Sequence, residues 1–133
     1  MSANVTDFEI YPREYDRLPE FLVRRVPGFE QSPEYLLVAD NFDLPGVIVG
    51  ALTPFVVRLE KASQSGTLDA AGAASLAGVY QAIEEMAASD DPEVENAVVV
   101  EVFEHLDADP RTLAAIREHL GPSSRALYSR WID

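Results

Sequence analysis

The stretch that decides the fold runs from residue 90 to residue 107 and reads DDPEVENAVVVEVFEHLD. As a β-strand it would alternate its side chains, so Glu101 would share a face with Val99 and Phe103. As an α-helix it gathers large apolar side chains on one broad arc: Val98, Val99, Val102, Phe103 and Leu106, flanked by Val94 and Val100. The opposite arc then holds Glu93, Ala97, Glu101, Glu104 and His105. Since the helical period alone separates apolar from charged residues, we predict a largely central helix with a narrow exposed stripe.

Proline follows a good capping residue at four places in the chain. A side-chain oxygen at the cap accepts a free helical N–H, and proline at the next position needs no hydrogen-bond partner for its nitrogen. Each such pair therefore predicts a helix start: Ser32-Pro33, Thr53-Pro54, Asp91-Pro92 and Asp109-Pro110.

Three further helices are predicted around this stretch. Apolar residues at helical spacing on an alanine-rich background indicate a helix over 68–88, whose small residues should let a neighbour pack closely: Ala71, Gly72, Ala74, Ala77 and Gly78. Leu113, Ile116 and Leu120 indicate a helix after Pro110 that stops at Gly121-Pro122. A last short helix should anchor the carboxyl end on the core through Leu127, Tyr128 and Trp131.

The first half of the sequence is less regular. We expect helices near 19–26 and over 33–41. Residues 44–65 fit one kinked helix, two helices meeting at Thr53-Pro54, or a strand at GVIVGAL, because Val47, Ile48 and Val49 are β-branched. The predicted class is all-α: one compact domain over 1–133 built as a bundle of about six to seven short helices, with room for HEAT-like hairpin packing.

Composition narrows the classes of function. The 133 residues are 47% hydrophobic, a content suited to one domain with a single hydrophobic core. They include no cysteine, so disulfides and the usual cysteine ligands of zinc are excluded. The 23 acidic against 10 basic residues give a formal net charge of -13, which repels phosphate backbones and anionic membranes and attracts cationic partners. We therefore expect no nucleic-acid binding. Without an apolar run of about 20 residues or a signal-peptide pattern, no membrane association and a cytoplasmic location are expected.

Searches for catalytic patterns lead to a non-enzymatic prediction. The sequence has no phosphate-binding P-loop, dinucleotide fingerprint, H-E-x-x-H helix or nucleophile elbow. Its carboxylates are too frequent to single out an acid and base pair, and we expect no cofactor.

Candidate binding residues come instead from the charged arc of 90–107. No lysine or arginine occurs between Lys61 and Arg111, so Glu93, Glu101 and Glu104, with His105, are predicted to bind a basic protein partner. Glu101 and His105 lie four residues apart, yet a histidine at a helix end is expected to interact with the helix dipole, and no metal site is predicted. Asn96 should fall on the buried side near Val100 and Phe103, as a structural tie or as a polar group offered to a ligand.

The residues DPEVENAVVVEVFEHL (91–106) and LAAIREHLGPSSRALYSRW (113–131) resemble a family of small, uncharacterised bacterial helical proteins. Their shared pattern is D-x-E-V-x-N, an apolar run, F-x-E-x-L, L-G-P and a closing tryptophan, and NFDLPG (41–46) adds a little more. Some relatives are similar to immunity proteins encoded beside secreted toxins. The resemblance implies an immunity or antitoxin role.

Three hypotheses for the function, from different classes, follow from the sequence. The first is a non-catalytic protein-binding domain, of the immunity type, whose acidic helical face binds a basic partner. The alternative is a small-ligand-binding or regulatory domain with a pocket between helices, lined by tyrosine and phenylalanine from the first third and by Asn96. A homo-oligomer without a site of its own is a third.

Overall fold

Capping side chains set where several of the helices begin. In the computed structural model, which describes residues 14–133, Ser32 accepts a hydrogen bond from the Tyr35 N–H at 3.1 Å, and Asp91 and Asp109 cap their helices in the same way. Each cap stands directly before a proline, so three of the four predicted helix starts are confirmed. Residues 14–133 contain helices and no strand, which confirms the all-α class.

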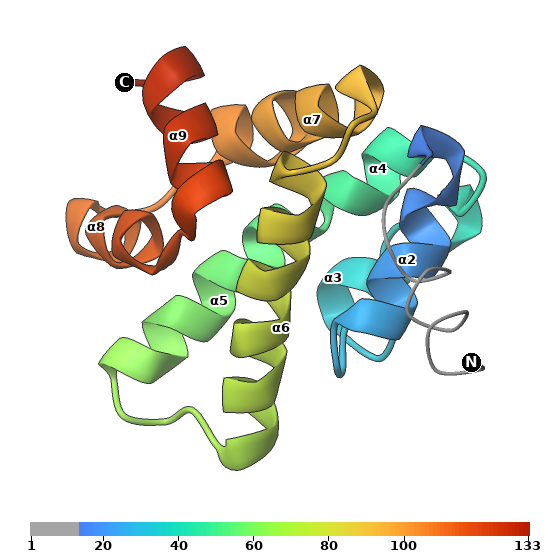
Figure 1. Ribbon diagram of the computed structural model, residues 1–133. Helices are drawn as coiled ribbons and strands as arrows, with labels where there is room; N and C mark the ends of the chain where they lie inside the picture. Colours follow the sequence, from blue (N-terminus) through green and yellow to red (C-terminus); the bar gives the residue numbers. More distant parts are fainter. Residues whose placement is uncertain (1–13) are drawn as a thin grey trace, which may run out of the picture.

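The helices surround a central antiparallel pair (Figure 1). In chain order the elements are the 3₁₀ turn η1 (Tyr15–Arg17), α2 (Leu18–Arg25), α3 (Pro33–Leu36), the 3₁₀ turn η2 (Ala39–Asn41), α4 (Pro45–Gly50), α5 (Leu52–Gln64), α6 (Ala70–Ala87), α7 (Pro92–Ala97), the π-helical segment η3 (Val98–Val102), the 3₁₀ turn η4 (Phe103–His105), α8 (Pro110–His119) and α9 (Pro122–Trp131). The neighbours α5 and α6 form the hairpin, α8 packs on α5, α9 packs on α6, and α2 packs against α4 and α6.

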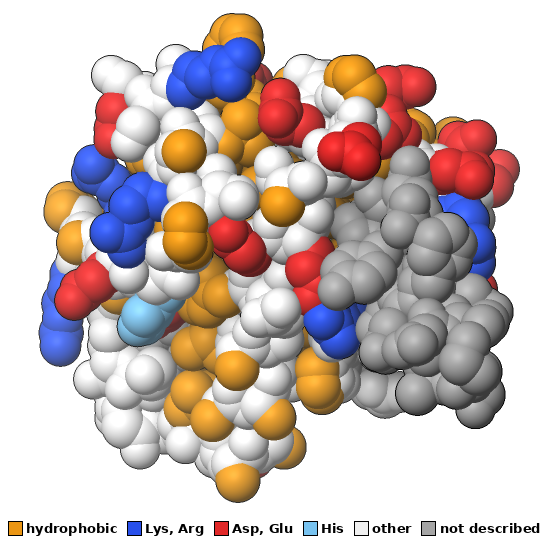
Figure 2. Space-filling model, viewed as in Figure 1, with side chains coloured by type: hydrophobic (Ala, Val, Ile, Leu, Met, Phe, Trp, Pro, Cys, Tyr) orange, Lys and Arg blue, Asp and Glu red, His pale blue; other side chains and the backbone are white. Residues whose placement is uncertain are grey.

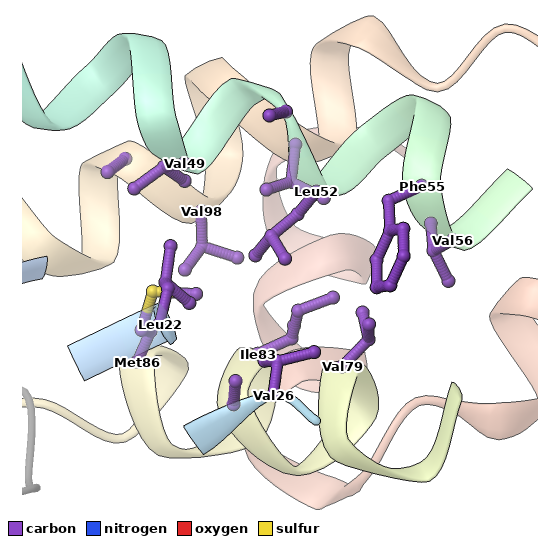
Figure 3. Close-up of a cluster of buried hydrophobic side chains, with 14 of the residues drawn as sticks. Leu22, Val26, Val49, Leu52, Phe55, Val56, Val79, Ile83, Met86 and Val98 are labelled. Atoms are coloured by element: carbon purple, nitrogen blue, oxygen red, sulfur yellow. The ribbon is translucent and has the colours of Figure 1, made fainter. Parts of the chain in front are cut away.

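One apolar cluster lies between these elements. Figure 3 shows side chains of α2, α4, α5, α6 and η3 pointing toward one another, among them Leu22, Val49, Phe55, Ile83 and Val98. All five are at most 2% exposed. Burial of such side chains is the main stabilising contribution to the fold, at about 1.5–3 kcal/mol for each large one.

Residues 44–65 form two helices that meet at Ala51, which settles the alternatives open in the sequence. Because α5 begins at Leu52, Thr53 lies inside its first turn and caps nothing. Thr53 is instead 4% exposed and donates a hydrogen bond to the backbone carbonyl of Glu101 at 3.0 Å. The predicted helix start at Thr53-Pro54 is therefore wrong, because the Thr53 hydroxyl binds a carbonyl of η3 and caps no helix.

Within the stretch 90–107, residues 92–105 are helical, but they do not form a uniform α-helix. After α7 it widens to π geometry over η3 and then tightens to a 3₁₀ turn. Val94, Val98, Val99, Val102 and Phe103 are buried, as the helical reading predicts.

The widened turn changes which residues share a face. In a regular α-helix, residues seven apart lie on the same side, which would place Asn96 under Phe103. The i→i+5 bonds of η3 insert an extra residue between them and rotate the two positions apart. Asn96 is consequently exposed and Ala97 is 3% exposed, so the predictions for both residues are wrong.

Thr53 provides a test of the link between α5 and the widened turn. The Thr53→Val variant is expected to lose about 1 kcal/mol of unfolding free energy, because it keeps the shape of the side chain but leaves the partly buried Glu101 carbonyl without its hydroxyl partner. Thr53→Ser, which retains the hydroxyl, should lose less. Denaturant unfolding measures both, and faster amide hydrogen exchange over 98–103 in the valine variant alone would locate the effect. Equal losses of unfolding free energy in the two variants would contradict a stabilising role of the Thr53 hydroxyl.

Two packing predictions need correction. Of the small residues of α6, Gly78 meets another helix, whereas Ala71, Ala74 and Ala77 are exposed. At the carboxyl end Leu127 and Tyr128 are buried as predicted, but Trp131 is 58% exposed, and the guanidinium of Arg130 lies over its ring.

Candidate functional site

The predicted acidic stripe lies at the surface but does not form one continuous group. Glu93, Glu104 and His105 are exposed, and Glu101 is half-buried. The Glu101 carboxylate lies against α4, where a Cβ on Gly46 would be 3.0 Å from Oε2 and a Cβ on Gly50 would be 3.6 Å from Oε1. Two glycines on successive turns of α4 therefore make room for this carboxylate.

Asn96 takes part in a surface hollow rather than an interior groove. Its hollow, about 330 Å³, is lined by Tyr15, Glu93 and Glu101 as well as Asn96 and neighbouring atoms of α7. The structure thus brings together two of the predicted partner-binding residues, the predicted polar residue and one tyrosine from the first third of the chain. Tyr11 and Phe8, which the ligand-pocket hypothesis includes, lie outside the described residues.

His105 lies in a different hollow. The Nδ1 atom donates to the Val100 carbonyl at 2.7 Å, because that oxygen only accepts, and this contact is the expected one for a histidine at a helix carboxyl end. The hollow beside it has a volume of about 430 Å³, and its lining residues include Arg58, Lys61 and Asp107. His105 therefore has a more basic environment than Glu93 and Glu101. Within residues 14–133, no cluster of three His, Asp or Glu side chains is suited to a metal ion.

The sequence patterns did not predict one group of exposed apolar side chains. This group extends over residues 36–47, from the end of α3 through η2 into α4, and we call it the acidic–apolar corner because Asp40 and Asp43 are exposed within it. Its apolar members are Leu36, Leu37, Phe42, Leu44 and Val47, with exposures from 38% to 86%. The available signal was an apolar segment that fits no helical period and has no lysine or arginine between Arg25 and Arg58.

The corner and the acidic stripe adjoin through α4. Exposed Leu44 is the N-cap residue of this helix and exposed Val47 lies within it, while Gly46 and Gly50 of the same six-residue helix face Glu101. Figure 2 shows Asp and Glu gathered over α7 and toward the right-hand edge, with Lys and Arg more frequent on the opposite side over α8 and α9. On the face shown, acidic and basic side chains are therefore unevenly distributed.

A second polar cluster lies at the opposite end of the molecule, between α5, α6 and α8. Glu60 is 1% exposed, and its Oε2 atom accepts hydrogen bonds from the Tyr80 hydroxyl and, at 2.6 Å, from His119 Nδ1. Burial is the main cause that raises the pKa of Tyr80 far above its usual value, and the bond to Glu60 and its charge add to it. The rings of Tyr80 and His119 meet edge to face at 5.3 Å.

The sequence contained a signal for this cluster as well. Glu60 follows Val56 by four residues, so it continues the apolar face of α5 with a charge. A buried carboxylate needs hydrogen-bond donors, which implies that residues distant in sequence converge on it.

Over residues 14–133 these features define a helical protein without strands, with an acidic surface and a buried carboxylate cluster. A family model described as Domain of unknown function (DUF7674) matches residues 19–133, and the chain belongs to that family. No curated protein and no solved structure matches the chain. Across residues 14–133, every helix is too short or too polar to cross a bilayer.

Proposed function

We propose that this protein is a non-catalytic binding domain whose acidic–apolar corner, extended by the acidic stripe, binds a basic protein partner. The observation that carries the proposal is the set of large apolar side chains exposed over residues 36–47, with Leu37 at 86%. Contiguous exposed apolar residues with a polar rim are typical of protein-interaction surfaces.

The charges of the surface indicate what kind of partner fits. Asp40 and Asp43 lie among the apolar residues, and Glu93, Glu101 and Glu104 lie on the neighbouring segments. Arg58 on α5, which packs against α3, is held by both Glu34 oxygens at 2.7 and 3.0 Å. A partner segment with apolar side chains beside basic ones, such as a basic amphipathic helix, would complement both the apolar residues and the carboxylates of this surface.

An immunity or antitoxin role agrees with this surface. A toxin that acts on nucleic acid needs a cationic active-site surface, and carboxylates can occupy such a surface in place of phosphates. The role rests on the resemblance of 91–131 and on charge complementarity. We place Glu93, Glu101 and Glu104 in the interface and expect His105, beside Arg58 and Lys61, at its margin.

Variants of exposed residues test this surface. Leu37→Ser and Glu104→Lys are each expected to weaken binding to the protein encoded by the adjacent gene, and to an amphipathic Lys/Leu helical peptide, by at least about tenfold. The physical reasons are loss of apolar contact and charge repulsion. Calorimetry at low and high salt measures the affinities, which should fall as salt rises.

Matched controls lie on the far side of the molecule. Trp131→Ser removes an exposed apolar side chain on α9, and Glu118→Lys makes the same charge change on α8. Neither should change the affinity by more than about twofold. Equal weakening by Glu118→Lys and Glu104→Lys would show that net charge, and not this surface, governs binding.

A further inference from the structure

The hairpin of α5 and α6 has a hollow on its open side that the proposed function does not use. We call it the α5/α6 hollow, and its volume is about 340 Å³. Its walls are mostly apolar, from Leu68, Ala73, Leu76 and Ala77, and its polar end is formed by Tyr80 and His119. In Figure 2 this apolar depression runs between α5 and α6 with a histidine at its edge. The volume is at the lower end of the range of small-molecule sites.

The polar end is oriented by Glu60. Since Glu60 Oε2 binds Nδ1 of His119, the ring presents Nε2 as its remaining polar atom, and the side chain is 51% exposed. A buried carboxylate behind a half-exposed imidazole fixes the orientation of the ring, with the Nδ1 proton directed toward Glu60 and Nε2 left as the acceptor. The same oxygen holds the Tyr80 hydroxyl, so the two aromatic side chains are fixed together.

Charge selects the class of ligand. The described side chains that line the hollow include no lysine or arginine, whereas a carboxylate lies directly behind the imidazole. A carboxylate or phosphate ligand would meet this negative charge within a protein of net charge -13. An ammonium group would be attracted by Glu60, by the Nε2 lone pair and by the face of the Tyr80 ring.

We propose that the α5/α6 hollow binds a small primary amine with an apolar body: the hydrocarbon lies over Ala73, Ala77 and Leu76, and the ammonium group lies at His119 and Tyr80, backed by Glu60. The site is on a different part of the molecule from the acidic–apolar corner and does not depend on the proposed function.

The test uses the full chain and 2-phenylethylamine as the probe, with 3-phenylpropanoate as an anionic probe of similar size. Titration followed by NMR of the backbone amides and the His119 ring should give saturable shifts for the amine, centred on α5, α6 and His119. The anionic probe should bind at least about tenfold more weakly. Absence of saturable shifts with the amine, or equal affinity for both probes, would overturn the proposal.

Two pairs of variants separate the walls from the polar end. Ala77→Leu fills the hollow from an exposed helix position, and Ala74→Leu makes the same change on α6 outside the lining. The first should abolish amine binding and the second should leave it unchanged. Glu60→Gln should weaken the amine at least about tenfold while sparing the anionic probe. If Glu60→Gln does not fold, the comparison of Ala77→Leu with Ala74→Leu still tests the site. Equal effects of these two variants on amine binding would refute it.

Discussion

The Gly78→Leu variant is expected to lose about 3 kcal/mol of unfolding free energy, because it places a side chain where α6 touches the end of α2. A Cβ on Gly78 would be 2.6 Å from Pro27 Cδ, 3.3 Å from Val26 Cα and 3.4 Å from the Arg25 carbonyl oxygen. A proline ring and backbone atoms cannot rotate away, so the two helices must separate.

The local hydrogen bonding strengthens this expectation. Ser75, one turn before Gly78, donates to the Pro27 carbonyl at 2.5 Å. The adjoining Gly28 has φ of +78°, a conformation that favours glycine, so the chain turns sharply against α6 at this point. Separation of the helices would also stretch the Ser75 bond.

Gly72 is the matched control in the same helix. Its added Cβ would meet the end of the Leu68 side chain at 2.5 Å, which can rotate, and Asp69 Oδ1 at 3.1 Å. Gly72→Ala should therefore change the free energy of unfolding little. The cost of moving the Leu68 side chain is offset by the better helix propensity of alanine, which contributes up to about 1 kcal/mol. Denaturant unfolding of both variants checks the pair. A Gly78→Leu variant as stable as Gly72→Ala would refute the close contact.

Gly121→Ala is expected to cost about 2 kcal/mol, because it displaces the side chain that caps α9. The N-cap position of α9 is Gly121, which has no side chain to accept a helical N–H. Glu84 of α6 substitutes for it and accepts from Ser123 N–H at 2.8 Å and from Ser124 N–H at 3.0 Å. A Cβ on Gly121 would stand 2.5 Å from Glu84 Oε1.

A double-mutant cycle identifies this mechanism. Glu84→Ala alone should destabilise the protein by a similar amount, and adding Gly121→Ala to it should cost much less than in the unmodified chain. Additive losses, measured by denaturant unfolding, would mean that the two residues act independently.

The same cap predicts a dependence on pH. Burial by itself would raise the pKa of Glu84, but the N–H groups of Ser124 and Ser123 and the Ser124 hydroxyl outweigh it and hold the pKa below the ordinary 4.5. A lowered folded pKa gives a contribution that is fully present above the unfolded value and is lost as pH falls through the folded pKa. The stability advantage over Glu84→Gln should therefore shrink below about pH 4.5. An advantage that grows with acidity would contradict it.

Much of the fold was predictable from local sequence. The cap-proline pairs at Ser32, Asp91 and Asp109 specify helix starts through hydrogen bonds that reach only two or three residues. The apolar arc of 90–107 specifies a helix because the period of its valines excludes a strand. In the candidate site, the same period placed Glu93 and Glu104 at the surface.

Interactions between distant positions were decided only in the tertiary structure. Thr53 bonds a carbonyl 48 residues away, beside the widened turn that rotates Asn96 to the surface. Glu60 and His119 meet across 59 residues. The exposed leucines of the corner are equally invisible to periodicity, because burial depends on which helix covers a face.

The sequence by itself thus determined the helical class, most helix boundaries and the strong negative charge, because capping, periodicity and composition act within a few residues or over the whole chain. The tertiary structure alone decided which polar groups are paired, which apolar side chains stay exposed and where hollows form. These features depend on how closely helices approach one another, as at Gly78 and Gly121, where the absence of a single Cβ makes the contact sterically allowed.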